Sequence, residues 1–360
     1  MTRPIVAEVD LAAIAANLAS VRRYAPATEV LAVVKANAYG HGLQRVLPAL
    51  GDADGLALIE LDAALALRAA GYSRTILMLE GFFDPSELDA IARHRLHVVV
   101  HNAEQVRMLE CTPLAARIDV YVKVNTGMNR LGFAPAHVAP VCSRLTGIAS
   151  VASIRLMMHF ARSEDADGIA APLAQFERAC AGLPYARSLA NSAGVVRYGE
   201  IGGEGVRPGI MLYGATPFAT RSADALGLLP AMTLRSKLIG VQTLASGDSV
   251  GYGASFRAPR AMRIGVVACG YADGYPRLAP NGTPVLVCGR RVPMAGRVSM
   301  DMVTVDLSAV PEAVVGSDVV LWGDGLPVDD VAAKASTVGY ELLCAVAPRV
   351  PFVVRERSGG

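Results

Sequence analysis

The sequence lacks any hydrophobic run long enough to cross a membrane. A membrane-spanning helix needs about 18 or more consecutive apolar residues, and no segment of the 360-residue chain approaches that length. The amino-terminal stretch MTRPIVAEVDLAAIAANL carries Glu8 and Asp10 where a signal peptide has an unbroken apolar core. We therefore expect neither insertion into a membrane nor a cleaved leader.

Cysteine and net charge are also scarce. The six cysteines are scattered with no Cys-x-x-Cys spacing, which favours free thiols in a reducing cytoplasm. A formal net charge of +2 gives no electrostatic reason to expect nucleic acid or an anionic membrane as a partner. With 52% hydrophobic and 18% charged residues, the composition fits a globular, enzyme-like protein with a large core.

No Gly-x-Gly-x-x-Gly motif follows the first strong apolar run, which argues against an open dinucleotide-binding sheet. Instead, eight short apolar runs end in polar residues, with helical segments between them. The runs end at Lys35, Glu60, Glu80, His101, Asn125, His159, Asn191 and Arg207. Strands that alternate with helices at this spacing predict an α/β fold with a parallel sheet. Eight such units predict a (β/α)₈ barrel, whose active site lies at the carboxyl ends of its strands.

Several of the intervening helices have recognisable start signals. Asp10 precedes the helical segment LAAIAANLASVRRY, and Asn102 stands where it can cap AEQVRMLE. Pro135 opens the segment AHVAPVCSRL. These signals support helices between the predicted strands.

The pattern changes after about residue 226. The remaining chain reads as short strands rich in valine and threonine, separated by glycine and proline turns. Only VDDVAAKAST looks helical there. We predict two domains, a barrel over residues 1–226 and a mostly antiparallel β domain over residues 227–360.

The stretch VLAVVKANAYGHG places Lys35 at the end of a buried strand and before a polar, glycine-rich turn. Desolvation at such a rim lowers the pKa of a lysine and makes its amine nucleophilic. That environment suits a lysine that forms a Schiff base. From this stretch alone, a surface lysine just past a strand end is an equally good interpretation.

Other polar residues follow the predicted strands or lie in glycine-rich loops. In the barrel they are Lys123 and Arg130 of KVNTGMNRLGF, His159, Arg207, and the loops NSAG (191–194) and PGI (208–210). In the β domain they are Tyr252, Tyr271, Met300 and Asp301. Taken singly, each has an ordinary structural explanation, such as a solvated charge, a core histidine or an interface tyrosine. The two loops are of the kind that hold a phosphate at the mouth of a barrel.

His94, His97 and His101 have a spacing that suggests a metal site. Ligands four residues apart on one strand diverge, and no cysteine or carboxylate is obviously placed to join them. We therefore expect no metal.

Taken in order, these motifs resemble the alanine racemase family. The resemblance runs through AVVKANAYGHG, KVNTGMNRLGF, MMHFA, NSAG, VRPGIMLYG, VGYGASF, GYADGY, GRVSMDM and the final RVP. It covers nearly the whole chain. It implies a barrel followed by a C-terminal β domain, and an isomerase that interconverts L-alanine and D-alanine with pyridoxal 5′-phosphate, for cell-wall synthesis or for D-alanine degradation.

The resemblance also assigns the cofactor contacts. Lys35 would carry the cofactor covalently, and Arg207 would face the pyridine nitrogen. The phosphate would be held by Tyr39, Asn191, Ser192, Gly209 and Ile210. Because an arginine cannot accept the ring proton, the nitrogen would stay largely unprotonated. This weakens the cofactor as an electron sink and disfavours transamination.

Racemisation needs a base on each face of the substrate. The resemblance assigns Lys35 to D-alanine and Tyr252 to L-alanine, with His159 and Arg207 in a hydrogen-bond chain that assists Tyr252. Substrate contacts would come from Arg130, which clamps the carboxylate, and from Met300, Tyr271 and Asp301. Lys123 would be carbamylated, so that an anion orients Arg130.

In this family two chains pack head to tail, and the β domain of one chain covers the barrel mouth of the other. We therefore expect a homodimer with shared active sites. Many members have a tyrosine near the cofactor phosphate where this chain has Pro348, and some have a cysteine where it has Ser299. The alternatives that remain open are a racemase for a broader range of small amino acids, such as serine, and an amino-acid decarboxylase of the same fold.

Overall fold

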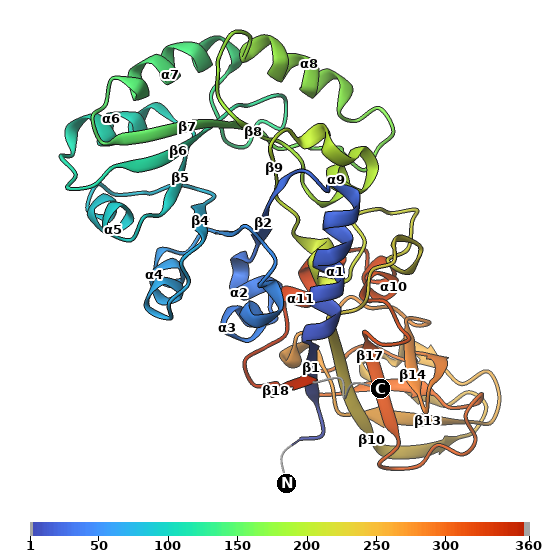
Figure 1. Cartoon of the computed structure of the whole chain (residues 1–360). Helices are drawn as coiled ribbons and strands as arrows, with labels where there is room; N and C mark the ends of the chain where they lie inside the picture. Colours follow the sequence, from blue (N-terminus) through green and yellow to red (C-terminus); the bar gives the residue numbers. More distant parts are fainter. Residues whose placement is uncertain (1–2, 356–360) are drawn as a thin grey trace. The chain divides into compact units, whose positions relative to one another are not determined.

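The computed structural model describes residues 3–355, and its chain forms two compact units (Figure 1). One contains Leu18–Ala38 and Leu50–Gly209. The other contains the chain up to Asn17, Tyr39–Ala49, and the chain from Ile210 onward. We describe each unit by itself.

The first unit holds a closed barrel of eight parallel strands, as predicted. Its strands are β2 (Glu29–Val33), β3 (Gly55–Leu58), β4 (Thr75–Met78), β5 (His97–Val100), β6 (Ile118–Lys123), β7 (Val151–Met157), β8 (Arg187–Ser188) and β9 (Gly205–Val206). They pair in chain order, and β9 closes the ring by pairing with β2. The strands are short and largely apolar because both of their faces are covered.

Helices follow most of the barrel strands. They are α4 (Leu61–Ala69), α5 (Glu87–Arg93), α6 (Ala103–Cys111), α7 (Val138–Thr146), α8 (Ala170–Ala179) and α9 (Ser192–Tyr198). The predicted cap of α6 is confirmed, since Asn102 Oδ1 accepts the Gln105 N–H over 2.8 Å. The cap of α1 (Leu11–Tyr24) is confirmed too, since Asp10 Oδ1 accepts the Ala13 N–H over 2.9 Å. Such caps satisfy N–H groups that have no partner within the helix.

The second unit is built on a mostly antiparallel sheet. Its strands are β1 (Val6–Asp10), β10 (Met232–Leu244), β13 (Met262–Val267), β14 (Pro284–Val287), β15 (Arg290–Pro293), β16 (Val303–Asp306), β17 (Asp318–Trp322) and β18 (Phe352–Arg355). The order is β15-β14-β17-β10-β1-β18, and β13 pairs with both β10 and β16. Strands β11 (Ser249–Val250) and β12 (Phe256–Arg257) form a separate hairpin.

Short helices complete this unit. They include α3 (Leu43–Val46), α10 (Val328–Lys334) and α11 (Gly339–Cys344), with single 3₁₀ turns at Ile210–Tyr213, Asp224–Leu226, Tyr252–Ala254 and Tyr271–Asp273. The prediction of one helix in the β domain was incomplete, because α11 was missed. At six residues, α11 spans fewer than two helical turns, which is too short for a helical pattern to be recognised. Among residues 3–355, no helix is long and apolar enough to cross a membrane.

Each of the two units contains more than one stretch of chain, so no single boundary at residue 226 separates them. Strand β1 pairs antiparallel with β10 and parallel with β18, so it belongs to the sheet of the second unit rather than to the barrel. The segment Ile210–Leu226 also groups with the second unit. The alternation of VAEVD indicates a strand but not its partners, since pairing between distant segments leaves no local signal.

Candidate active site

Five of the predicted site residues lie at one end of the barrel. Lys35 follows β2, Lys123 ends β6, His159 follows β7, Asn191 follows β8, and Arg207 follows β9. In a closed parallel barrel the carboxyl ends of all strands meet at one rim. The barrel therefore gathers residues that are far apart in the sequence.

Lys35 opens a left-handed turn. Ala36, Asn37, Ala38 and Tyr39 have φ of 53°, 52°, 57° and 50°, and the Ala38 N–H donates to the Val34 carbonyl over 2.8 Å. Left-handed geometry costs about 1–2 kcal/mol per residue other than glycine. Strain of this kind persists only where surrounding structure fixes it, and it concentrates at functional sites. The sequence predicted a turn here but not its handedness.

Tyr39, at the end of this turn, is buried and stacks on Tyr213. Its ring is also 6.0 Å from that of Tyr340 in α11. Burial, followed by the nearby Tyr340 and Cys344, raises the pKa of Tyr39 well above its usual value. Tyr39 is therefore a protonated phenol at neutral pH, and so can donate a hydrogen bond to an anion.

Lys123, Arg130 and His159 line one small hollow at the rim. Lys123 is buried, and its pKa falls to about 8 through desolvation and the positive charges of Arg207, Arg130 and Lys35. An appreciable fraction of this amine is therefore neutral near pH 8. The lysine and the arginine that sequence analysis paired lie together in the structure.

His159 is half-buried among the same cations. Desolvation is the largest cause, and the charges of Arg207 and Lys123 add to it, lowering the pKa of His159 to about 3. The imidazole is consequently neutral at physiological pH. Its Nε2 lies 3.4 Å from Nδ2 of Asn191. A neutral ring can donate from one nitrogen and accept at the other, as a hydrogen-bond chain requires.

Arg207 is buried and held by carbonyl groups. Its guanidinium donates to Ser188 O and Oγ, each over 2.6 Å, and to Met158 O over 2.6 Å. Burial lowers the pKa of Arg207 to about 10, which still leaves it charged at neutral pH. Fixed carbonyl acceptors therefore hold a permanent cation at the end of β9.

The loops after β8 and β9 meet through Ser192 and Gly209. The Gly209 N–H donates to Ser192 Oγ over 2.9 Å, and Ser192 is buried. Asn191 caps α9 by accepting the Gly194 N–H over 3.0 Å, and it also accepts the Ser163 hydroxyl. A backbone amide and a hydroxyl thus lie side by side, which fits a phosphate oxygen better than an apolar group. Asn191 therefore stabilises this loop through hydrogen bonds to Gly194 and Ser163. Nothing in the sequence singled out Ser163.

In the second unit, Tyr252 stands at the tip of the β11–β12 hairpin. Its side chain is 69% exposed. The tip is sharply turned, with φ of 69° at Gly251 and 72° at Gly253. The hairpin is anchored by a small apolar cluster of Val250, Ala258, Met262 and Ile264, against which Leu244 and Phe256 pack. The apolar cluster therefore fixes the base of the hairpin, while the Tyr252 side chain is exposed at its tip.

Tyr271, Met300 and Asp301 lie on two adjoining loops of the same unit. The Tyr271 N–H donates to Ser299 O, and the Ala272 N–H donates to Met300 O, each over 3.0 Å. Tyr271 and Met300 are 40% and 52% exposed. Tyr252, Tyr271 and Met300 are thus three of the large hydrophobic side chains that this unit exposes.

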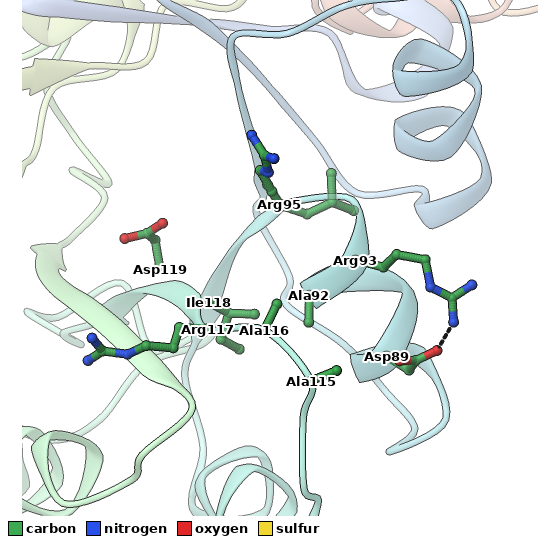
Figure 2. A pocket seen from close by; sticks show the side chains of 10 residues that line it. Asp89, Ala92, Arg93, Arg95, Ala115, Ala116, Arg117, Ile118 and Asp119 are labelled. Atoms are coloured by element: carbon green, nitrogen blue, oxygen red, sulfur yellow. Dashed lines mark hydrogen bonds and ion pairs between the residues drawn. The ribbon is translucent and has the colours of Figure 1, made fainter.

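A larger hollow, of about 500 Å³, lies at the other end of strands β5 and β6 (Figure 2). It contains none of the predicted site residues. The guanidinium groups of Arg93, Arg95 and Arg117 point in different directions there, and Arg93 pairs with Asp89. The cations do not converge on a common ligand position, so this hollow lacks the geometry of the barrel rim.

A closed barrel with a lysine after its first strand, β2, buried cations at its rim and an added β domain defines a barrel enzyme that acts on an anionic substrate or cofactor. Residues 9–217 match the family model "Alanine racemase, N-terminal domain", and residues 231–354 match "Alanine racemase, C-terminal domain". The chain belongs to the alanine racemase family, and it is therefore an isomerase.

Individual relatives are similar to this chain over nearly its full length. The chain is 56% identical to the alanine racemase of Nitrosospira multiformis, over 98% of this chain and 100% of the relative. It is 52% identical to a catabolic alanine racemase of Klebsiella aerogenes, over 98% of this chain and 99% of that one. The crystal structure of a biosynthetic alanine racemase from Pseudomonas aeruginosa superimposes with a TM-score of 0.96 at 48% identity, covering 99% of this chain and 100% of the other.

Proposed function

We propose that this protein interconverts L-alanine and D-alanine with pyridoxal 5′-phosphate as its cofactor. The observation that carries the proposal is the group of cationic and polar side chains at the carboxyl rim of the barrel, where Lys35, Lys123, His159 and Arg207 act on one another electrostatically. Such a rim suits a cofactor with an anionic phosphate and a substrate with a carboxylate.

The residues present fit the cofactor. Lys35 would bind it covalently, and Tyr39, Ser192, Gly209 and Ile210 would hold its phosphate, with Asn191 behind them. The adjacent Ser192 hydroxyl and Gly209 amide support this assignment. When bound, pyridoxal phosphate would withdraw electrons from the amino acid and so acidify its α-proton. Arg207, a charged donor held by backbone carbonyls, would face the ring nitrogen without accepting a proton from it.

Two bases would handle the α-proton. Lys35 would remove it from D-alanine and Tyr252 would remove it from L-alanine, each returning a proton to the face that the other has deprotonated. His159 is neutral, because its pKa is about 3, and could relay a hydrogen bond from Arg207 toward the phenol. The two-base arrangement makes rotation of the substrate unnecessary.

The substrate carboxylate would be held by the guanidinium of Arg130, with Met300, Tyr271 and Asp301 completing the pocket. We propose that the neutral Lys123 amine adds to carbon dioxide and loses one proton, which gives a carbamate. A pKa of about 8 makes the neutral amine available for this addition. The cation beside Arg130 would become an anion that orients it.

We further propose a homodimer in which Tyr252 of one chain serves the barrel of the other. The exposure of Tyr252, Tyr271 and Met300 on the second unit supports this assembly, because their burial against a partner would stabilise it.

The test begins with the purified protein. We expect an absorption band of bound cofactor in the visible or near-ultraviolet region, and conversion of L-alanine to D-alanine without release of carbon dioxide or pyruvate. Release of carbon dioxide would favour the decarboxylase alternative, and equal kcat/KM for serine would favour the broader racemase. Borohydride reduction and peptide mapping should find the pyridoxyl group on Lys35; finding it on Lys123 would overturn the assignment.

A further inference from the structure

The loops that carry Tyr271 and Met300 are joined by a closed circuit of three ion pairs and one hydrogen bond to a backbone carbonyl. Asp273 accepts from Arg3 Nη1 and Nη2, over 2.6 and 3.1 Å, and from Arg349 Nε over 2.8 Å. Arg349 Nη2 donates to Asp301 Oδ1 over 2.6 Å, and Arg3 Nη2 donates to the Asp301 carbonyl over 2.7 Å. Each arginine therefore links Asp273 of one loop to Asp301 of the other.

Asp273 is the buried member of this circuit. Its side chain is 0% exposed, whereas those of Arg3, Arg349 and Asp301 are 38%, 40% and 46% exposed. Burial alone would raise its pKa, but hydrogen bonds from Arg3, Arg349 and the Gly270 N–H outweigh burial and lower it. The carboxylate therefore stays ionised, and removing a partner would leave a buried charge unsatisfied.

The backbone around Asp273 leaves little room for movement. A side chain at Gly270 would come within 2.3 Å of the Met300 carbonyl, and one at Gly274 within 2.2 Å of the Ala345 carbonyl. The Ala347 N–H donates to the Asp273 carbonyl over 3.1 Å. The circuit thus sits where three chain segments, 270–275, 299–302 and 345–349, pack together.

The contacts between the two loops use the carbonyl of Met300 but not its N–H. The carbonyls of Ser299 and Met300 are used by Tyr271 and Ala272, and the Ser299 N–H donates to Met302 O. Among residues 3–355, the Met300 N–H has no acceptor. The family resemblance assigns Met300 to the substrate, so this N–H is the donor that we expect a substrate carboxylate to meet.

We propose that Asp273, Arg349 and Arg3 are positioning residues that fix the Met300 amide and Tyr271 for the substrate. None of the three touches the reacting atoms. The inference rests on the proposed function for the identity of the substrate. Disturbing the circuit should therefore weaken substrate binding more than it slows the chemical step.

The test uses the intact, cofactor-loaded protein and three variants. Arg349→Lys keeps the charge but loses the planar fork that reaches Asp273 and Asp301 together. Asp273→Asn removes the buried charge. Asp318→Asn is the matched control, since it breaks an exposed ion pair with Lys237 in the same unit and touches no member of the circuit.

We expect Arg349→Lys to raise the KM for alanine at least fivefold while kcat changes less than twofold, with the cofactor absorption unchanged. Hydrogen exchange should become at least tenfold faster at the Tyr271 and Ala272 amides. The sole tryptophan, Trp322, stacks on Tyr275 at 5.8 Å, so its near-ultraviolet circular dichroism reports the same loop independently. Asp318→Asn should match the parent in every measurement.

Unchanged KM and unchanged exchange in a folded Arg349→Lys protein would overturn the inference, whether or not Asp273→Asn folds. Equal falls in kcat and kcat/KM without a change in KM would overturn it as well, because they would assign the circuit to the chemical step. If the parent does not racemise alanine, the proposed function fails, and the exchange measurement still decides whether the circuit fixes the loops.

Discussion

The ring of Tyr39 stacks on the ring of Tyr213, with centroids 4.7 Å apart and an interplanar angle of 25°. Tyr39 precedes Gly40 and His41 follows it. The ring centroid of His41 also lies 4.7 Å from that of Tyr213. One aromatic side chain therefore holds both residues that flank Gly40, at the end of the strained left-handed turn that begins at Lys35. Gly40 itself has a φ of 80°, and a side chain there would meet the Leu343 carbonyl of α11 at 2.2 Å.

Replacing Tyr213 with leucine should destabilise the left-handed turn that begins at Lys35. The two lost ring contacts correspond to about 1–3 kcal/mol, since aromatic pairs contribute about 0.5–1.5 kcal/mol each beyond their buried area. We expect a lower Tm and at least fivefold weaker binding of pyridoxal phosphate, measured by absorbance titration of the apo-protein. Tyr213→Phe keeps both rings in contact and isolates the effect of the hydroxyl. Cofactor binding at the parental affinity in Tyr213→Leu would contradict the role given to the stack.

Lys123→Ala should lose most of its activity, because no anion would then orient Arg130. Added acetate, a small carboxylate, should restore part of kcat in a saturable manner. The matched control is Lys237→Ala, which removes an exposed lysine of the β domain and should neither lose activity nor respond to acetate. Full activity in Lys123→Ala, or no response to any small carboxylate, would count against the carbamate.

Shared active sites can be tested by complementation. Chains with Lys35→Ala and chains with Tyr252→Phe should each be nearly inactive as homodimers. If Tyr252 acts on the partner's barrel, a mixed dimer has one site with both defects and one intact site, so activity returns to at most half that of the parent per dimer.

The control for this experiment pairs Lys35→Ala with a chain that carries both substitutions. That mixture contains no intact site under either arrangement and should stay inactive. Differential tags on the two chains establish that mixed dimers have formed. A lack of rescue in confirmed mixed dimers would refute the shared site.

Asp329 predicts a pH-dependent effect on stability. Burial is the main cause that raises its pKa to about 6, although the Thr216 N–H, 2.9 Å from Oδ2, opposes the shift. Because the folded state favours the protonated carboxyl, its contribution to stability is fully present below the unfolded pKa of about 3.9. That contribution is lost as the pH rises through about 6.

Asp329→Asn should therefore have a higher Tm than the parent at pH 8, and this difference should shrink at pH 5. Thermal unfolding at the two pH values measures it. Asp224→Asn, at an exposed carboxylate of the same unit, is the control for the loss of a negative charge without the loss of a buried carboxyl. A Tm difference for Asp329→Asn that is equal at both pH values would show that its carboxyl is not buried in this way.

The barrel was predictable because its signals are local. Each strand is a short apolar run that ends in a polar residue, so Lys35 and Arg207 could be placed at strand ends without knowing which strands pair. The handedness of the turn after Lys35 could not be foreseen, since Ala36 and Ala38 have no intrinsic preference for positive φ. Tyr39 and Gly40, which follow these alanines, pack against α11, and that helix gave too short a pattern to recognise.

Contacts between residues far apart in the sequence could not be predicted either. Asp273 and Arg3 are 270 residues apart, and Asp273 and Arg349 are 76 residues apart. A single sequence offers no periodic pattern that would join them. The motif GYADGY marked Tyr271 through the family resemblance, whereas the role of Asp273 in the same motif became apparent only from its buried hydrogen bonds.

The pairing of β1 with β10 and β18 has a consequence for the order in which the molecule is made. All barrel strands lie between Glu29 and Val206, so the barrel can close while later segments are still being translated. Strand β1 is synthesised before the barrel strands, whereas its partners β10 and β18 are synthesised after them. Ala7, for example, cannot pair until Phe352 has been made. The second unit can therefore be completed only after β18 has been synthesised, and with it the support for Tyr271 and Met300.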